Sequence, residues 1–407
     1  MTSPKSPPDE VRLRLAFIIQ HPIHYHAPLW RAVAADPDID SIVHYMQRAW
    51  SESGYDPEVA RVVDWGVPML EGYRWRVWRN ISPMRNGVGF WKFINPGLIW
   101  HVLTGPYDAV YVHGCNHFSH VMAMLAGRLS GKRVIFRTDT YNLGERSVWR
   151  ALLRELSYAL ILRLPSVCLV VGHHNRRFYA SAGVADGQMV YAPQVVDNDY
   201  FTAAARRLVP QRDALKAGFA IAPESKILLW SAKFQAKKQP LLLLDAFART
   251  TAAGPWTLLM AGDGELLEAA KARAVTLGIQ DRVVFTGFLD QQRIVEAYAV
   301  ADLFVLPSGW QETWGLVVNE AMNFSLPVVV SDRVGAAPDL VAGRAGLVFR
   351  HDDGDDLVAK LEQMMGDAAL RRRFAESGRK TIEAWSVPAY VAGLRRALGL
   401  GRSRLDP

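Results

Sequence analysis

Short apolar runs alternate with helix-like segments along almost the whole chain, and this alternation limits the possible folds more than any other feature. One series of runs ends near residue 191, and a second begins near residue 227. Short buried strands joined by helices are typical of parallel sheets with crossover connections. The runs expected to form strands are 13–19, 41–45, 109–113, 133–137, 167–171 and 189–191, then 227–231, 257–261, 283–286, 303–306 and 327–331.

Two such series predict an α/β protein with two Rossmann-like, doubly wound domains. A chain of 407 residues is too long for one ordinary core, and half of its residues are hydrophobic, which is enough for two cores. The break is expected near 193–209, where a polar, basic stretch follows the first series. We therefore assign residues 1–200 to one domain, 201–380 to a second, and 381–407 to a terminal helical segment.

Two glutamates stand eight positions apart across a predicted strand-to-helix junction. The run 301–306 is expected to be a strand, 307–312 a turn and 313–324 a helix, which places Glu312 in the loop and Glu320 about two turns inside the helix. The helix N-terminus near 313–315 suits a phosphate. A carboxylate accepts two neighbouring hydroxyl donors at once. The pair therefore indicates a nucleotide-sugar site.

Ligands of open parallel sheets bind beyond the carboxyl ends of the strands. Most polar side chains and glycines of interest follow a predicted strand directly, so they should gather at facing sheet edges that form a cleft. By contrast, the acidic run 36–40 precedes a strand and is interpreted as a solvated turn. The residues at the strand ends are His21, His24, His26, His113, Thr138, Asp139, Lys233, Lys238, Gly262, Asp263, Gly264, Gly287, Phe288, Glu312 and Gly335.

Two lysines fit the charge of a diphosphate. Lys233 and Lys238 precede a helix expected at 241–248, and two ammonium groups with a helix N-terminus can neutralise a departing diphosphate without a metal. The turn at 262–264 lacks the third glycine of a dinucleotide fingerprint, because Leu267 stands in its place. An NAD-dependent oxidoreductase is therefore disfavoured.

The spacing of Glu312 and Glu320, with the following Pro-Val-Val-Val-Ser-Asp and Gly335, resembles the retaining family 4 glycosyltransferases of the GT-B fold. The resemblance implies that Glu312 contacts the donor hexose and Glu320 the nucleotide ribose. It also implies that the last helix crosses back onto the first domain and that the two Rossmann-like domains face each other across a cleft. Further donor-site residues implied by the resemblance are His113 at the sugar, Lys233 and Lys238 at the diphosphate, Gly287 and Phe288 at the nucleobase, and Gly335.

The implied activity is transfer of a hexose from a nucleoside diphosphate sugar, such as a UDP- or GDP-sugar, to a hydroxyl acceptor. The family implies retention of anomeric configuration by front-face attack and requires no cofactor or metal. His113, Glu312 and Lys238 are the expected catalytic residues. Ser325 departs from the family, which commonly places glycine after this helix, where a left-handed cap is easier for glycine.

The acceptor is expected to contact the first domain. His21, His24 and His26 replace the glycine-rich first loop typical of the family, and Asp139 stands where many members carry a histidine. Acceptor contact by His21, His24 and Asp139 is the favoured interpretation. A zinc site is the alternative, although no Cys or Glu completes a convincing ligand set. The acceptor itself is expected to be a glycan or a lipid-linked intermediate.

Two other functions stay open. A nucleotide-sugar epimerase or hydrolase could use the same architecture and would consume donor without acceptor. The formal charge of +7 also fits a non-enzymatic protein that binds nucleic acid or membranes. Carboxylates in the proposed cleft would repel phosphate backbones, so nucleic acid is not an expected partner.

The chain is expected to be cytoplasmic, or peripheral on the inner face of a membrane. Residues 1–10 are polar, no long uncharged apolar stretch exists, and there are only two cysteines. Aromatic and basic residues interleave at 73–79 and 90–100, and Arg146, Arg150 and Arg154 recur at helical spacing beside leucines. An anionic membrane surface is thus an expected partner.

Overall fold

The computed structural model describes residues 12–47, 54–56, 61–63, 68–85, 87, 89–140, 148–251, 254–310 and 312–401. The start of the chain, on which the expectation of no signal peptide depends, lies outside these residues. Within the described ranges, no helix has the length and apolar composition needed to cross a bilayer.

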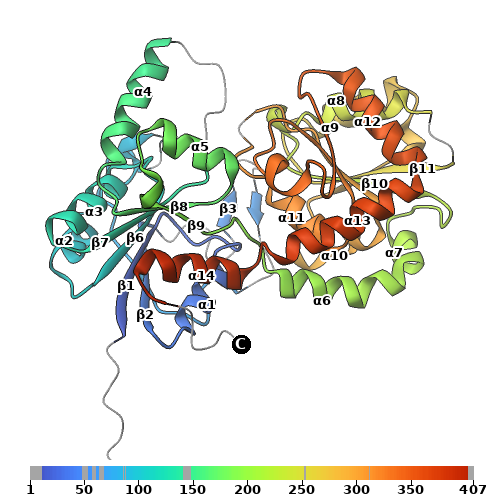
Figure 1. Cartoon of the computed structure of the whole chain (residues 1–407). Helices are drawn as coiled ribbons and strands as arrows, with labels where there is room; N and C mark the ends of the chain where they lie inside the picture. The colour runs from blue at the N-terminus through green and yellow to red at the C-terminus, as the bar shows by residue number, and fades with distance from the viewer. Residues whose placement is uncertain are drawn as a thin grey trace, which may run out of the picture.

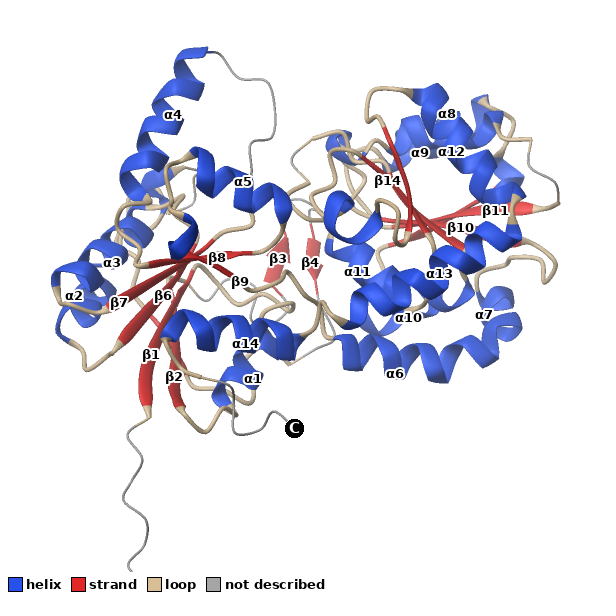
Figure 2. Cartoon of the chain, viewed as in Figure 1, coloured by secondary structure: helices blue, strands red, loops and turns tan. Residues whose placement is uncertain are grey.

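The chain forms two parallel sheets side by side, each covered on both faces by helices (Figure 1, Figure 2). The sheet of seven strands has the order β5 (Trp75–Val77), β2 (Ile39–Tyr45), β1 (Leu13–Ile19), β6 (Ala109–His113), β7 (Arg133–Arg137), β8 (Val167–Val170) and β9 (Met189–Tyr191). The sheet of six has the order β12 (Val283–Gly287), β11 (Trp256–Ala261), β10 (Lys226–Ser231), β13 (Leu303–Leu306), β14 (Val328–Ser331) and β15 (Gly346–Phe349).

In both sheets the strand order reverses beside the first strand, which is the doubly wound pattern predicted from the sequence. The strands β5 and β15 and the short hairpin of β3 (Gly54–Asp56) and β4 (Arg61–Val63) were not predicted. Each is only three or four residues long and contains a Gly or an Arg, so none shows the unbroken apolar run by which the equally short β8 and β13 were predicted.

The first lobe consists of the sheet of seven strands and its helices. Residues of β1 alternate between the two faces: Leu15 and Phe17 pack with one core and Ala16 and Ile18 with the other. One face is covered by α2 (Pro96–Thr104), α3 (Phe118–Leu129) and α5 (His173–Ser181), and the other by α1 (Ala27–Ala34) and α14 (Val387–Leu398). Helix α4 (Val148–Ile161) extends away from this lobe (Figure 1).

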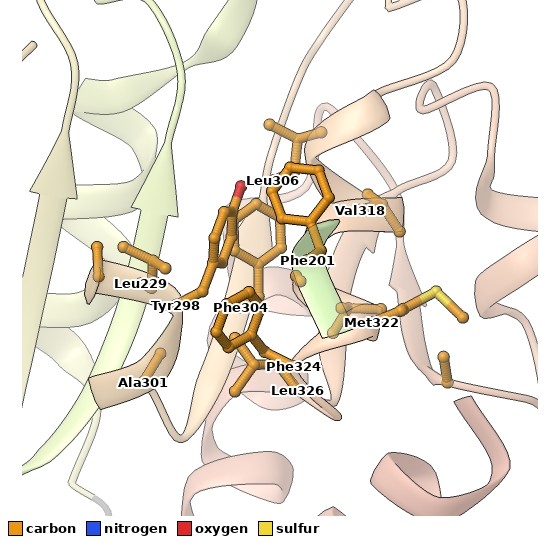
Figure 3. Close-up of a cluster of buried hydrophobic side chains, with 14 of the residues drawn as sticks. Phe201, Leu229, Tyr298, Ala301, Phe304, Leu306, Val318, Met322, Phe324 and Leu326 are labelled. Carbon is orange, nitrogen blue, oxygen red and sulfur yellow. The ribbon is translucent and has the colours of Figure 1, made fainter. Parts of the chain in front are cut away.

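The second lobe is built on the sheet of six strands. One core contains residues of α6 (Asn198–Leu208), α10 (Gln291–Val300) and α11 (Leu316–Asn323), and Figure 3 shows part of it around Phe201, Tyr298 and Phe304. The opposite core contains residues of α8 (Pro240–Arg249), α9 (Leu267–Thr276), α12 (Gly354–Gly366) and α13 (Ala368–Glu383). Helix α7 (Arg212–Gly218) packs against the first of these two cores through Leu215. The domain boundaries at 200 and 380 stay predictions.

Helix α14 returns from the second lobe to the first and is fixed there by a buried ion pair. Arg395 donates to both carboxylate oxygens of Asp36 at 2.7 Å and to Asp38 at 2.7 Å. The side chains of Arg395 and Asp36 are 4% and 3% exposed. The interpretation of the acidic run 36–40 as a solvated turn is therefore wrong for Asp36, because a helix distant in sequence covers it.

We expect Arg395→Met to lower the free energy of unfolding by about 3–5 kcal/mol, because it leaves the buried Asp36 carboxylate without its counter-charge. Arg249→Met removes an ion pair whose side chains are 55% and 85% exposed and should cost at most about 1 kcal/mol. Urea unfolding of both variants measures the difference. Equal small losses would show that the pair does not hold α14 in place.

Candidate active site

A cavity of about 200 Å³ lies between the two lobes, at the edge where the strands of the second sheet end. The strand order of that sheet reverses between β10 and β13, and this is where doubly wound sheets bind their ligands. The cavity is lined by His24 and Tyr25 from the first lobe, and from the second by Ser231, Ala232, Lys233, Ala261, Gly262, Asp263, Phe288, Leu289, Gln291, Ile294, Val317 and Glu320.

Glu320 is a buried carboxylate shared by the two lobes. It is 5% exposed, and its Oε1 accepts a hydrogen bond from the Tyr25 hydroxyl at 2.8 Å while Oε2 accepts one from Tyr298 at 2.7 Å. Burial raises the pKa of Glu320 to about 7, although the two hydroxyls act in the opposite direction. Tyr25 follows β1 in the first lobe. Tyr298 lies on α10 of the second lobe, and its ring is drawn in Figure 3. Both oxygens of Glu320 are thus engaged.

Glu312 and Lys238 do not line this cavity but form an ion pair with each other. The Glu312 carboxylate accepts hydrogen bonds from the Lys238 ammonium and, at 2.8 Å, from the Ser308 hydroxyl. The side chains of Lys238 and Glu312 are 16% and 12% exposed. Burial and the neighbouring charges of Glu320 and Glu312 raise the pKa of Tyr25. Both glutamates therefore lie close enough to Tyr25 for their negative charges to oppose its ionisation.

The helix that carries Glu320 begins later than the sequence predicted. Helix α11 starts at Leu316 instead of residue 313, because Gly315 has a left-handed φ of 88° and forms the N-cap. Glu320 therefore lies only about one turn inside the helix, and the phosphate-favouring N-terminus is at Gly315. Thr313 instead donates from Oγ1 to Asp139 Oδ2 at 2.9 Å, which is a second contact between the lobes. At the other end, Ser325 adopts the left-handed conformation with φ of 57°.

Two glycines let the loops of the second lobe pack tightly around the site. The N–H of Gly335 donates to the Glu312 carbonyl at 3.0 Å, and a Cβ on Gly335 would lie 1.9 Å from the Thr313 carbonyl oxygen. Gly287, with φ of 68°, accepts at its carbonyl from the N–H of Gly262 at 2.9 Å and precedes Phe288 in the cavity wall. Gly335 thus supports the segment that bears Glu312.

The candidate histidines of the first lobe are neutral at physiological pH. Burial lowers the pKa of His24 to about 3, and burial with the charge of Arg137 lowers the pKa of His113 to about 3. The His113 ring lies 4.8 Å from that of His26, in the loop that also carries His24. Burial, followed by Lys92, lowers the pKa of His21 to about 4. These rings can donate or accept hydrogen bonds but carry no charge.

The predicted residues do not all meet in one place. The cavity is lined by His24, Lys233, Phe288 and Glu320. His21 and Asp139 do not line it: burial and the charge of Lys92 lower the pKa of His21, and Asp139 accepts a hydrogen bond from Thr313. Within the ranges that the structure describes, no group of three or more His, Cys, Asp or Glu could hold a metal ion. Metal independence and the absence of a cofactor stay predictions.

Sequence reasoning missed the tyrosines at Glu320 and the hydroxyls at Glu312 and Asp139. Tyr25 and Tyr298 are 295 and 22 positions from Glu320 in sequence, and no motif links them to it. Ser308 and Thr313 lie within four residues of Glu312, but their partners could not be read from the sequence. Only the tertiary structure reveals these contacts.

Comparison with known proteins finds a family that is similar to the second lobe. Residues 211–381 match the family described as Glycosyl transferases group 1. The D-inositol 3-phosphate glycosyltransferase of Mycolicibacterium smegmatis is 35% identical over 219 residues, which cover 51% of this chain and 48% of that protein. The match therefore spans about half the length of this relative.

Solved structures extend the similarity to both lobes. The structure of HepE of Anabaena with UDP has a TM-score of 0.71 at 16% identity and covers 95% of this chain and 100% of that one. The lipopolysaccharide outer core galactosyltransferase WaaB has a TM-score of 0.65 at 18% identity, with 95% and 99% covered. The protein thus has the predicted GT-B architecture, and its second half is similar to the family described as Glycosyl transferases group 1.

Glu320 should make the folded protein less stable as the pH rises. Its pKa is raised from 4.5 to about 7 in the folded state, so as the pH rises the unfolded chain loses this proton before the folded protein does. Ionisation therefore stabilises the unfolded state relative to the folded one. Stability from this group is therefore lost between about pH 4.5 and pH 7. Glu320→Gln cannot ionise, so its melting temperature relative to the wild type should increase over this range.

Thermal melts at a series of pH values measure this difference. Glu376→Gln, at an exposed glutamate, is the matched control and should track the wild type at every pH. A difference between Glu320→Gln and the wild type that does not change with pH would contradict a raised pKa at this site.

Proposed function

We propose that this protein is a glycosyltransferase that moves a hexose from a nucleoside diphosphate sugar, UDP- or GDP-linked, to a hydroxyl acceptor. The observation that carries the proposal is the cavity at the reversal of strand order, which combines a buried carboxylate, Glu320, with a cation, Lys233. A nucleotide diphosphate offers the matching groups, because its ribose hydroxyls donate to a carboxylate and its phosphates accept from an ammonium group.

In this proposal each end of the donor has its own partners. Glu320 accepts from the ribose hydroxyls, and Gly287 and Phe288 face the nucleobase. Lys233 and the N-terminus of α11 near Gly315 stabilise the diphosphate, with Gly335 supporting that segment. Glu312 and His113 position the hexose. A neutral His113 suits this role, because a hydroxyl can both donate to it and accept from it.

The chemistry we propose needs no cofactor or metal. The bond between the anomeric carbon and the diphosphate oxygen breaks, and a new bond forms between that carbon and the acceptor oxygen. The acceptor hydroxyl gives its proton to the leaving phosphate, on the same face of the sugar, so that configuration is retained. Lys238 would leave its pairing with Glu312 to meet the charge developing on the leaving group.

The acceptor we propose is a glycan or a lipid-linked intermediate that enters from the first lobe, beside His21, His24 and Asp139. The names of similar proteins support a sugar-transfer role: one is named as acting on D-inositol 3-phosphate, and WaaB as a galactosyltransferase of the lipopolysaccharide outer core. We place the protein in the cytoplasm or at the inner face of a membrane, with an anionic lipid surface as a partner.

The first test is a panel of UDP, GDP, dTDP and ADP in thermal-shift and calorimetric measurements. One of them should bind, and Glu320→Gln should weaken it roughly 10- to 100-fold, through loss of one or two charge-assisted hydrogen bonds. Unchanged affinity would remove Glu320 from the ribose. Consumption of the matching nucleotide sugar without any acceptor would indicate a hydrolase or epimerase instead.

Tyr25 should compete with the donor for Glu320. Its hydroxyl occupies Oε1 at 2.8 Å and Tyr25 lines the cavity, which Tyr298 does not, so a ribose in the cavity can use Oε1 only after Tyr25 moves away. We expect Tyr25→Phe to tighten nucleotide binding by about three- to tenfold, the size of one net hydrogen bond. Tyr298→Phe, which removes the hydroxyl on the other oxygen but leaves the lobe contact intact, should not tighten binding. Weaker binding by Tyr25→Phe would mean that Tyr25 contacts the donor itself.

A further inference from the structure

Helix α4 presents leucines to solvent along its length. Leu152, Leu153, Leu156 and Leu160 are 46%, 65%, 53% and 64% exposed. Their spacing of three, four and seven positions places them on one face of a helix. The helix stands out from the first lobe (Figure 1), and within the described ranges no other element buries these four leucines.

The opposite face of α4 packs on the protein. Tyr158 lies with its ring 4.9 Å from that of Phe178 on α5, and Arg154 and Tyr158 line a small cavity together with Phe178. Leu162, just after the helix, is 4% exposed. The helix therefore packs on the protein through Arg154, Tyr158 and Ile161, yet it also leaves a stripe of leucines in solvent, which an ordinary surface helix would not.

The expected basic stripe of Arg146, Arg150 and Arg154 stays a prediction, because the structure describes only one of the three side chains. Arg154 faces α5 and is only partly exposed. Arg146 and the side chain of Arg150 lie outside the described residues. In the part that the structure describes, four leucines dominate the outward surface of α4, and Glu155 and Ser157 are exposed beside them.

A second group of exposed apolar side chains lies nearby on the same lobe. Trp91 is 51% exposed and stacks at 5.3 Å on Phe118, at the start of α3. Tyr158 of α4 forms a side-chain hydrogen bond with the thiol of Cys115, a residue that lies three positions before Phe118. Both groups thus adjoin the loop between β6 and α3. Of the fifteen large exposed apolar residues in the described ranges, ten fall in 75–100 and 152–160.

The same part of the chain carries the positive charge. Between residues 72 and 185 there are fifteen Lys and Arg but only four Asp and Glu, an excess of eleven, whereas the whole chain has a net charge of only +7. The remainder of the chain is therefore net negative. Apolar side chains within a basic surface match an anionic lipid bilayer, where lipid tails take the leucines and headgroups attract the cations.

We infer that α4 is a membrane-docking helix whose leucines enter the headgroup region of an anionic bilayer. This inference deepens the proposed membrane partner and rests on that proposal. A helix of 14 residues is about 21 Å long, shorter than the roughly 30 Å hydrocarbon core, so α4 lies on the surface without spanning it. A second copy of the chain is the less suitable occupant, because two equally basic faces repel each other.

The test is co-sedimentation of the full chain with vesicles of phosphatidylglycerol and phosphatidylcholine in equal parts, and with pure phosphatidylcholine. The wild type should bind the anionic vesicles at low salt. The double variant Leu153→Gln, Leu156→Gln should bind them at least about tenfold more weakly, because the apolar contact is lost without a change of charge. Leu129→Gln, at a leucine that is 72% exposed at the far end of α3, should bind like the wild type.

Three outcomes would overturn the inference. The wild type does not bind anionic vesicles; the double variant binds them as well as the wild type; or the wild type is a dimer by analytical ultracentrifugation that the double variant abolishes without any vesicle binding. Nucleotide binding, measured on the same samples, should be equal in all variants and reports separately on the proposed function. If the wild type binds no nucleotide, the proposed glycosyl transfer is contradicted. The vesicle result then tests membrane docking independently.

Discussion

The carboxylate of Glu320 is the point on which the arrangement of the two lobes depends. A carboxylate that is only 5% exposed must receive hydrogen bonds, and here one comes from each lobe, through Tyr25 and Tyr298. The bonds to Glu320 and Asp139 bring the strand ends of both sheets to one cavity. A ligand that replaces Tyr25 would exchange a contact between lobes for a contact with itself, so binding and lobe position are coupled.

The two edges that meet at the cavity differ in their chemistry. The edge of the second lobe carries the charged groups Lys233, Lys238, Glu312 and Glu320, within loops fixed by close backbone contacts. The edge of the first lobe carries buried, neutral histidines. Fixed charges suit a diphosphate and a diol, which have constant chemistry. Neutral hydrogen-bonding rings suit hydroxyl groups, which the acceptor would present to His24 and the donor hexose to His113. The division supports a donor side and an acceptor side.

The first lobe also concentrates the exposed leucines of α4, the exposed aromatic side chains near Trp91 and the excess of positive charge. The compensating negative charge lies at the start of the same lobe, where residues 1–71 have ten Asp and Glu but six Lys and Arg, whereas residues 186–407 are neutral overall. If the acceptor is attached to lipid, docking through the first lobe would bring it to the histidine edge while the donor enters the second lobe from water. The fold would then separate an aqueous substrate from a membrane-bound one.

The sequence by itself determined the architecture, and it also predicted the donor-side residues. Parallel strands such as β6 and β13 are buried on both faces, so their unbroken apolar runs are visible without coordinates. The tertiary structure alone decided the partners: Tyr25 at Glu320, Arg395 at Asp36, and the outward direction of Leu153. Local periodicity reports how much of a segment is apolar, but which side is covered depends on elements hundreds of residues away.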